Sequence, residues 1–109
     1  MNQDFIDQFT PITEEFNKKV NQIDIFGGYE FLLDQFKARN IDCFINCIEI
    51  VYGDDTELSV TYKIIDKNNN QNQINLNYYY TNEERNISEI VKKLIELKIT
   101  FRLQYVGEK

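Results

Sequence analysis

The stretch Glu57-Leu-Ser-Val-Thr-Tyr-Lys-Ile64 alternates strictly between polar and apolar side chains. A period of two is typical of a strand that packs one face against a core and turns the other face to water. Residues 73–80 and 99–105 alternate in the same way. The sequence therefore predicts three half-buried strands, each with one wet face.

A fourth strand is predicted immediately before this stretch, over residues 41–52. It is rich in Ile, Cys, Phe and Val and apolar on both faces, which favours a central place in the sheet or cover on its second side. The tight turn at 53–55 and the polar loop at 66–72 then connect the first three strands into an antiparallel meander. The pattern leaves open whether the last strand joins the first strand or the third.

Two helices are predicted ahead of the strands, because apolar residues recur there at spacings of three and four. The first starts at Thr10, with Pro11 at its first helical position. The paired glycines at 27–28 predict a break, so the second helix covers residues 29–39 and stops at Asn40. The apolar face of the first helix consists of Ile12, Phe16, Val20 and Ile23.

A third helix is predicted between the third and last strands. Asn86 is its expected cap, and Glu89 three residues later completes an approximate capping box. The element order is then α-α-β-β-β-α-β, which predicts an α+β two-layer sandwich with a mostly antiparallel four-stranded sheet and helices on one face. A chain of 109 residues is expected to form a single globular domain over its whole length, residues 1–109.

The chain has no histidine, and this absence removes several chemistries. Ser-His-Asp and Cys-His mechanisms both need an imidazole base, and zinc sites usually take Cys and His ligands. The phosphate-loop pattern G-x-x-x-x-G-K-[ST] is also absent from the sequence. We therefore expect a protein that is not an enzyme and that binds no cofactor and no metal.

Two features that resemble ligand sites have simpler explanations. Cys43 and Cys47 would lie about 13 Å apart on a strand, too far to bond to each other, so we expect two small buried apolar residues. The loop that begins at Asp66 starts like a calcium loop, but its sixth position is Gln71 instead of Gly and its twelfth is Asn77 instead of Glu. A polar hairpin loop is expected there.

The formal net charge of −6 limits the choice of partner. Nucleic acid and anionic lipid both need clustered Lys and Arg, so neither is expected as a partner. An acidic surface instead attracts and orients a basic protein partner, although the same charge would also arise from solubility alone. The start of the chain lacks the regions of a signal peptide, and no apolar run approaches the roughly 20 residues of a membrane span, so a cytoplasmic location without membrane contact is expected.

Two surfaces are candidates for contact with a protein partner. The densest acidic cluster lies at the hairpin tip of residues 54–57, where turn formation is an equally good explanation. The wet face of the sheet would present a tyrosine among Asn, Gln and Arg, which is typical of a protein interface and also compatible with an ordinary solvated face. The expected partner-binding residues are Asp54, Asp55, Glu57, Asn77, Tyr79 and Arg102.

These observations favour a small acidic binding protein over an enzyme. The first hypothesis is an inhibitor, such as an immunity protein that neutralises a toxin domain by direct contact in the cytoplasm. One alternative is a secretion chaperone that holds an extended effector segment. Another is a phage-type mimic of nucleic acid, which needs a dense array of acids on one surface and is disfavoured by the interspersed lysines. The oligomeric state cannot be read from the sequence.

Overall fold

The computed structural model describes residues 3–19, 23–53, 57–79 and 87–106. The observed order confirms the predicted one, with α1 as a short additional helix before the first predicted helix. Among the described residues, none of the helices has the length and apolar character needed to cross a membrane. The elements are α1 (Gln3–Asp7), α2 (Thr10–Lys19), α3 (Ile25–Ala38), β1 (Cys43–Tyr52), β2 (Glu57–Asp66), β3 (Gln71–Tyr79), α4 (Ile87–Glu96) and β4 (Phe101–Tyr105).

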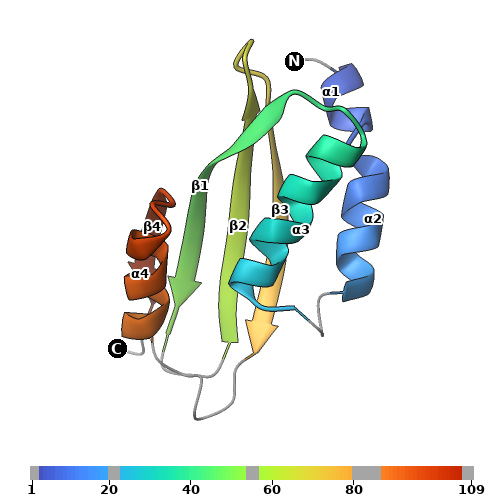
Figure 1. The fold of residues 1–109 in the computed structure, drawn as a ribbon. Coiled ribbons are helices and arrows are strands. Elements are labelled where there is room, and N and C mark those ends of the chain that lie inside the picture. The colour runs from blue at the N-terminus through green and yellow to red at the C-terminus, as the bar shows by residue number, and fades with distance from the viewer. Residues whose placement is uncertain (1–2, 20–22, 54–56, 80–86, 107–109) are drawn as a thin grey trace.

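The four strands form one mixed sheet with the order β3-β2-β1-β4 (Figure 1). β1 pairs with β2 and β2 with β3 in antiparallel fashion, as the predicted meander requires. β4 lies beside β1 and runs parallel to it, which answers the question that the sequence left open. A parallel neighbour needs a crossover connection, and α4 lies in that connection. β1 is internal, in agreement with its apolar character on both faces.

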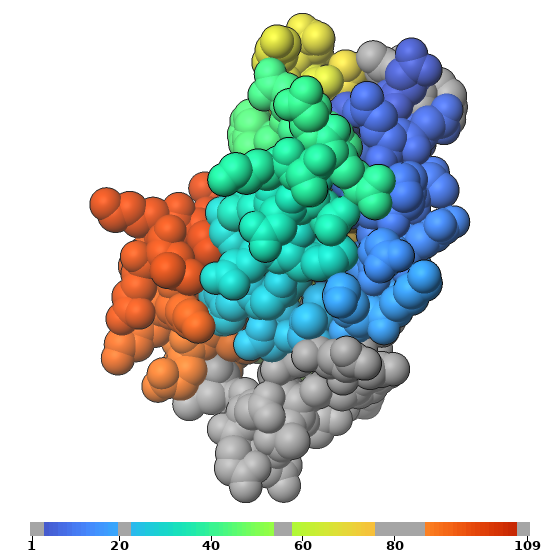
Figure 2. Space-filling model, turned by 45° about the vertical axis from the view of Figure 1, so that its right-hand side comes forward, coloured from blue at the N-terminus to red at the C-terminus, as the bar shows by residue number. Residues whose placement is uncertain are grey.

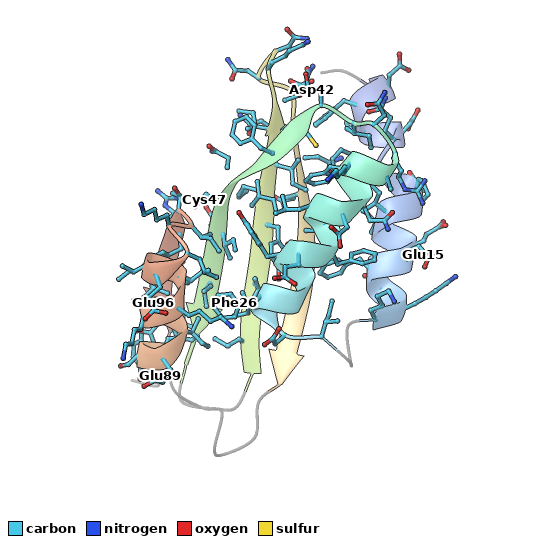
Figure 3. All side chains as sticks on the ribbon, in the orientation of Figure 1. Glu15, Phe26, Asp42, Cys47, Glu89 and Glu96 are labelled. Carbon is cyan, nitrogen blue, oxygen red and sulfur yellow. The ribbon has the colours of Figure 1, made fainter. Side chains whose placement is uncertain are left out.

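All four helices lie on one side of the sheet (Figure 1), so the predicted two-layer sandwich is confirmed. α4 contacts α3 through Phe26 (Figure 3), whose ring centroid lies 4.6 Å from the Lys93 ammonium group. Along β2 the burial follows the predicted alternation, since Val60, Tyr62 and Ile64 are buried and the residues between them are not. The helices contribute Phe5, Ile12, Phe16, Ile25, Leu32, Phe36 and Leu94 to the same core.

The predicted break at the paired glycines is wrong, because α3 runs through both of them. The helix begins after Asp24, whose carboxylate accepts a hydrogen bond of 2.7 Å from the Gly27 N–H. Gly28 faces Tyr62, and a Cβ atom at this position would lie only 2.5 Å from the tyrosine oxygen. That hydroxyl donates a 2.7 Å hydrogen bond to the carbonyl of Ile25. Gly28 therefore allows a close approach of helix and sheet and does not mark a turn.

α2 begins at Thr10 as predicted, but the predicted place of Ile23 on the same helix is wrong, because Ile23 lies outside any helix and packs against the core from the segment before α3. α3 ends at Ala38 with Arg39 as its C-cap, and Asn40 takes the left-handed backbone conformation (φ 58°) that stops a helix. The predicted contribution of Val20 to the first helix and the predicted cap at Asn86 lie outside the described residues.

Candidate partner-binding face

The side of the sheet that faces away from the helices carries a continuous set of side chains from all four strands. Their positions follow from the strand register and the alternation of side chains between faces. None of them is buried. We call this set the open face; its members are Phe44, Cys47, Glu49, Val51, Ser59, Thr61, Lys63, Ile65, Gln71, Gln73, Asn75, Arg102 and Gln104.

A β-bulge in β1 places an aromatic ring on the open face. The register between β1 and β2 shifts between Ile45 and Cys47, so that Asn46 has no partner in the ladder. Before the bulge, Ile45 packs against the core while Phe44, paired with Ile65, is 53% exposed. In a regular strand of the same sequence, even-numbered residues would all point to one face, and Phe44 would point to the core with Ile48 and Ile50. The bulge therefore turns an apolar side chain outward.

The same bulge puts the two cysteines on opposite faces of the sheet. Both thiols are free, as predicted. The expectation that both are buried is wrong, because each is only partly buried: Cys43 packs against the core and Cys47 lies on the open face. Burial, with the carboxylates of Asp42 and Asp66, raises the pKa of Cys43 to about 11. Burial and Glu49 also raise the pKa of Cys47. Neither thiol is therefore activated as a nucleophile.

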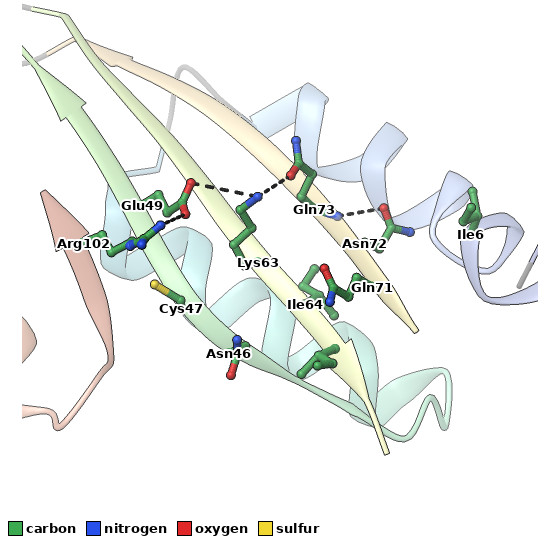
Figure 4. Close-up of a pocket in the computed structure, with 11 residues that line it drawn as sticks. Ile6, Asn46, Cys47, Glu49, Lys63, Ile64, Gln71, Asn72, Gln73 and Arg102 are labelled. Carbon is green, nitrogen blue, oxygen red and sulfur yellow. Dashed lines mark hydrogen bonds and ion pairs between the residues drawn. The ribbon is translucent and has the colours of Figure 1, made fainter. Parts of the chain in front are cut away.

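Charged and amide groups form rows across the strands of the open face (Figure 4). Arg102 lies 3.2 Å from one carboxylate oxygen of Glu49, and the Lys63 ammonium lies 4.0 Å from the other. Lys63 also donates a 2.9 Å hydrogen bond to Gln73. Exposed ion pairs of this kind contribute little to stability, typically about 0–1 kcal/mol. Their main effect is to hold donors and acceptors in fixed directions on an accessible surface.

A hollow of about 550 Å³ runs along the open face and extends to Asn72 on β3 and Ile6 of α1 (Figure 4). Ile65 and Cys47 supply apolar surface in it, and Glu49, Lys63 and Arg102 supply charge. Its volume falls in the range of ligand pockets, about 300–1,000 Å³. Apolar surface bordered by polar groups is also how a protein interface accepts a protruding side chain.

The predicted partner-binding residues divide into three groups. Arg102 lies on β4 and contacts Glu49. The backbone register places Glu57 directly opposite Tyr79, so two predicted residues meet at one end of β2 and β3, and Asn77 lies two residues away from Tyr79 on the same strand. Asp54 and Asp55 lie outside the described residues.

The sequence reasoning did not identify Phe44 and Glu49 as members of the open face. A signal was present: the apolar residue Ile45 has the opposite parity from Ile48 and Ile50, although all three belong to one strand. A change of parity within a strand is the pattern that a one-residue bulge produces. Glu49 could have been found from its odd position after that change.

The loop between β2 and β3 is a polar hairpin loop, as predicted. The Asp66 carboxylate accepts hydrogen bonds from the backbone N–H groups of Asn68 and Asn70 at 2.9 and 2.8 Å and from the Asn70 amide at 3.0 Å. The Asn70 side-chain bond is the largest cause that lowers the pKa of Asp66. This carboxylate therefore closes the turn. Within the described ranges, no three Cys, Asp or Glu side chains come together as a metal site.

No protein-family model, curated protein or solved structure matches this chain.

Proposed function

We propose that this protein is an inhibitor of the immunity type, which neutralises another protein by direct contact through the open face. The observation that carries the proposal is the combination of a helix-covered sheet with an uncovered, bulge-shaped opposite face. Phe44 supplies an exposed aromatic anchor there, and Arg102 and Lys63 stand beside the hollow. Aromatic residues and arginine are the side chains that most often dominate the binding energy of protein interfaces.

The groups on the open face favour a binding role in this proposal. Glu49 forms ion pairs with Lys63 and Arg102, and burial raises the pKa of Cys47, the thiol on this face. A nucleophilic thiol needs the opposite change, a lowered pKa. Fixed donors and acceptors around an apolar anchor instead give shape and charge complementarity to a protein surface.

The partner in this proposal is a basic protein. The chain has a net charge of −6. Residues 3–39 contain seven acidic and four basic residues. These acids lie on the helix side of the sheet, so they can raise the rate at which a basic protein encounters the inhibitor. They give no charge complementarity at the open face itself, whose described charges are Lys63, Arg102 and Glu49. The acids counted are Asp4, Asp7, Glu14, Glu15, Asp24, Glu30 and Asp34, and the bases are Lys18, Lys19, Lys37 and Arg39.

A mimic of nucleic acid is less well supported by the same surface. Such a mimic needs a dense row of acids, whereas the described charges of the open face are Lys63, Arg102 and a single acid, Glu49. The combination of these charges with the apolar side chains of Phe44 and Ile65 suits a partner that offers both apolar and polar groups.

The test compares two exposed apolar residues on opposite sides of the molecule. Phe44→Ala removes the anchor of the open face, and Leu33→Ala removes a leucine that is 39% exposed on α3. In cells that express a toxic protein domain which the wild type neutralises, Leu33→Ala should protect equally and Phe44→Ala should protect poorly. Calorimetry should show that Phe44→Ala weakens binding by about thirtyfold, the scale of a hot-spot residue.

Two results would overturn the proposal. Wild-type protein that fails to protect cells and fails to bind such a domain would remove the inhibitor function. Equal binding by Phe44→Ala and Leu33→Ala would place the interface somewhere other than the open face. Circular dichroism of both variants verifies that each is folded.

A further inference from the structure

The exposed large hydrophobic residues of the described chain gather at one edge of the sheet. Five of the seven lie within residues 95–106, which comprise the end of α4, the following loop, and β4 with Val106. Figure 2 shows α4 and the chain that follows it, in orange and red, forming one side of the molecule beside α3. A contiguous apolar surface of this kind marks an interaction site. The five residues are Ile95, Leu97, Leu103, Tyr105 and Val106.

β4 is also an edge strand with main-chain groups directed outward. The Ile48 N–H donates to the Thr100 carbonyl at 3.0 Å, and the Val106 N–H donates to the Tyr52 carbonyl at 2.8 Å. Even-numbered residues of this segment therefore direct their N–H and C=O groups to β1. The groups of Phe101 and Leu103, between them, point away from the sheet. Such an edge is a template for pairing with another strand.

We propose that this edge pairs with the same edge of a second copy of the chain. β4 of one copy would run antiparallel to β4 of the other, with the twofold axis at Leu103, so that two four-stranded sheets join into one. Leu103 would then pair with Leu103 of the second copy through both outward N–H and C=O groups. The exposed residues Ile95 and Leu97 would meet the α4 side of the second copy.

Charge favours this register over its neighbour. With the axis at Leu103, Arg102 faces the uncharged Gln104 of the second copy, whereas a shift of the axis to Arg102 would oppose two arginines. Arg102 is the only charge on β4, and Glu49 already neutralises it. The contact segment 95–106 carries one acid, Glu96, and two bases, Lys98 and Arg102, so its charges nearly balance although the whole chain has a net charge of −6.

The edge is also large enough for a stable contact. A specific interface takes about 800 Å² from each partner, which is about a ninth of the 7243 Å² surface of this chain. Residues 95–106 are 12 of the 109 residues, and all of them except Ile99 and Phe101 are exposed. The segment thus offers ten exposed residues, five of them large and apolar, to such an interface.

Substitutions at Gln104 test the register without disturbing the fold, because this side chain is exposed opposite Val51. Gln104→Glu would place a carboxylate opposite Arg102 of the second copy, twice by symmetry. Sedimentation equilibrium should then show a dimer dissociation constant about two- to thirtyfold lower than that of the wild type. Gln104→Lys should raise it by a similar factor. Leu103→Glu should abolish the dimer, and Leu33→Glu, at a leucine of nearly equal exposure, should leave it unchanged.

The outcomes separate the pairing from the alternatives. A wild-type chain that stays monomeric up to about 1 mM overturns the pairing, since weaker contacts carry no specific assembly. A dimer that responds to neither Gln104 variant also overturns it, because that dimer uses another surface. If Leu103→Glu does not fold, the two Gln104 variants still test the pairing, because they should shift the dimer dissociation constant in opposite directions. Protection of cells by a strictly monomeric protein would overturn the pairing alone and leave the inhibitor function intact.

Discussion

The two faces of one sheet use neighbouring residues of the same strands for different purposes. On the helix side, Tyr62 is buried against Phe16, with ring centroids 5.8 Å apart, and its hydroxyl is satisfied by the carbonyl of Ile25. On the open face one residue further along, Lys63 reaches across to Gln73 and Glu49 through contacts that water can replace. The first set of contacts contributes to stability, and the second lies on a surface that is accessible to solvent.

This difference leads to a simple expectation about substitutions. A buried side chain loses both its transfer free energy and its packing when it is truncated. An exposed one loses little of either, so its truncation changes the free energy of unfolding by about 0.5 kcal/mol or less. Substitutions on the covered face should therefore alter stability, and those on the open face should alter binding.

The largest contrast is expected between Ile64 and Ile65, which are adjacent, chemically identical and directed to opposite faces. Ile64 is 1% exposed and packs in the core, so Ile64→Ala should lower the free energy of unfolding by about 2–5 kcal/mol. Ile65→Ala, on the partly exposed open face, should cost about 1 kcal/mol or less. Urea unfolding of the two variants measures both. Equal losses would show that the open face is packed as tightly as the core.

The next contrast concerns the two neighbouring glycines of α3. Gly28→Ala would force a Cβ atom to within 2.5 Å of the Tyr62 oxygen and 3.2 Å of the Phe16 ring, which should cost about 2–3 kcal/mol. Gly27→Ala meets only Asp24 and Ile23, at 3.2 Å or more, and gains helix propensity, so its effect should stay within about 1 kcal/mol.

Tyr62→Phe sharpens this comparison, because it removes the oxygen that the new methyl group would meet. In that background Gly28→Ala should cost less than in the wild type, and the two substitutions should not be additive. Additive losses would show that the tyrosine hydroxyl does not set the distance between helix and sheet.

The two faces also differ in how far the sequence predicts them. The alternation of residues 57–64 correctly gave the buried side of β2, because burial there follows a strict period of two. The bulge at Asn46 was missed, because one extra residue changes the face of everything before it while leaving the composition of the strand unchanged. The paired glycines were misread for a related reason: the need for Gly28 comes from Tyr62, which lies 34 residues further along the chain.

The candidate site was predictable only in part. Arg102 could be placed on a wet sheet face because its strand alternates, and the structure pairs it with Glu49. That pairing depends on β4 lying parallel to β1, a long-range choice that the local pattern does not encode. The open face therefore had to be assembled from the register of four strands.

The smallest effects are expected from the two cysteines. Their reaction rates with iodoacetamide show how accessible each face of β1 is. Both raised pKa values disfavour the thiolate, so at pH 8 each cysteine should react with iodoacetamide more slowly than a free thiol. The rate at Cys43 should keep rising with pH toward its pKa of about 11, and Cys47 should react first because it lies on the open face. Cys47→Ser assigns the faster phase.

The sign of the linked stability effect follows from the same shift. Because the folded state raises the pKa of Cys43, the protonated thiol is favoured on folding. Its contribution to stability is complete below the ordinary thiol pKa and is lost as the pH rises toward about 11. Cys43→Ser should flatten the fall in unfolding free energy above pH 9, whereas Cys47→Ser should change it less. A faster reaction at Cys43 than at Cys47 would place the bulge differently and reverse the two faces of β1.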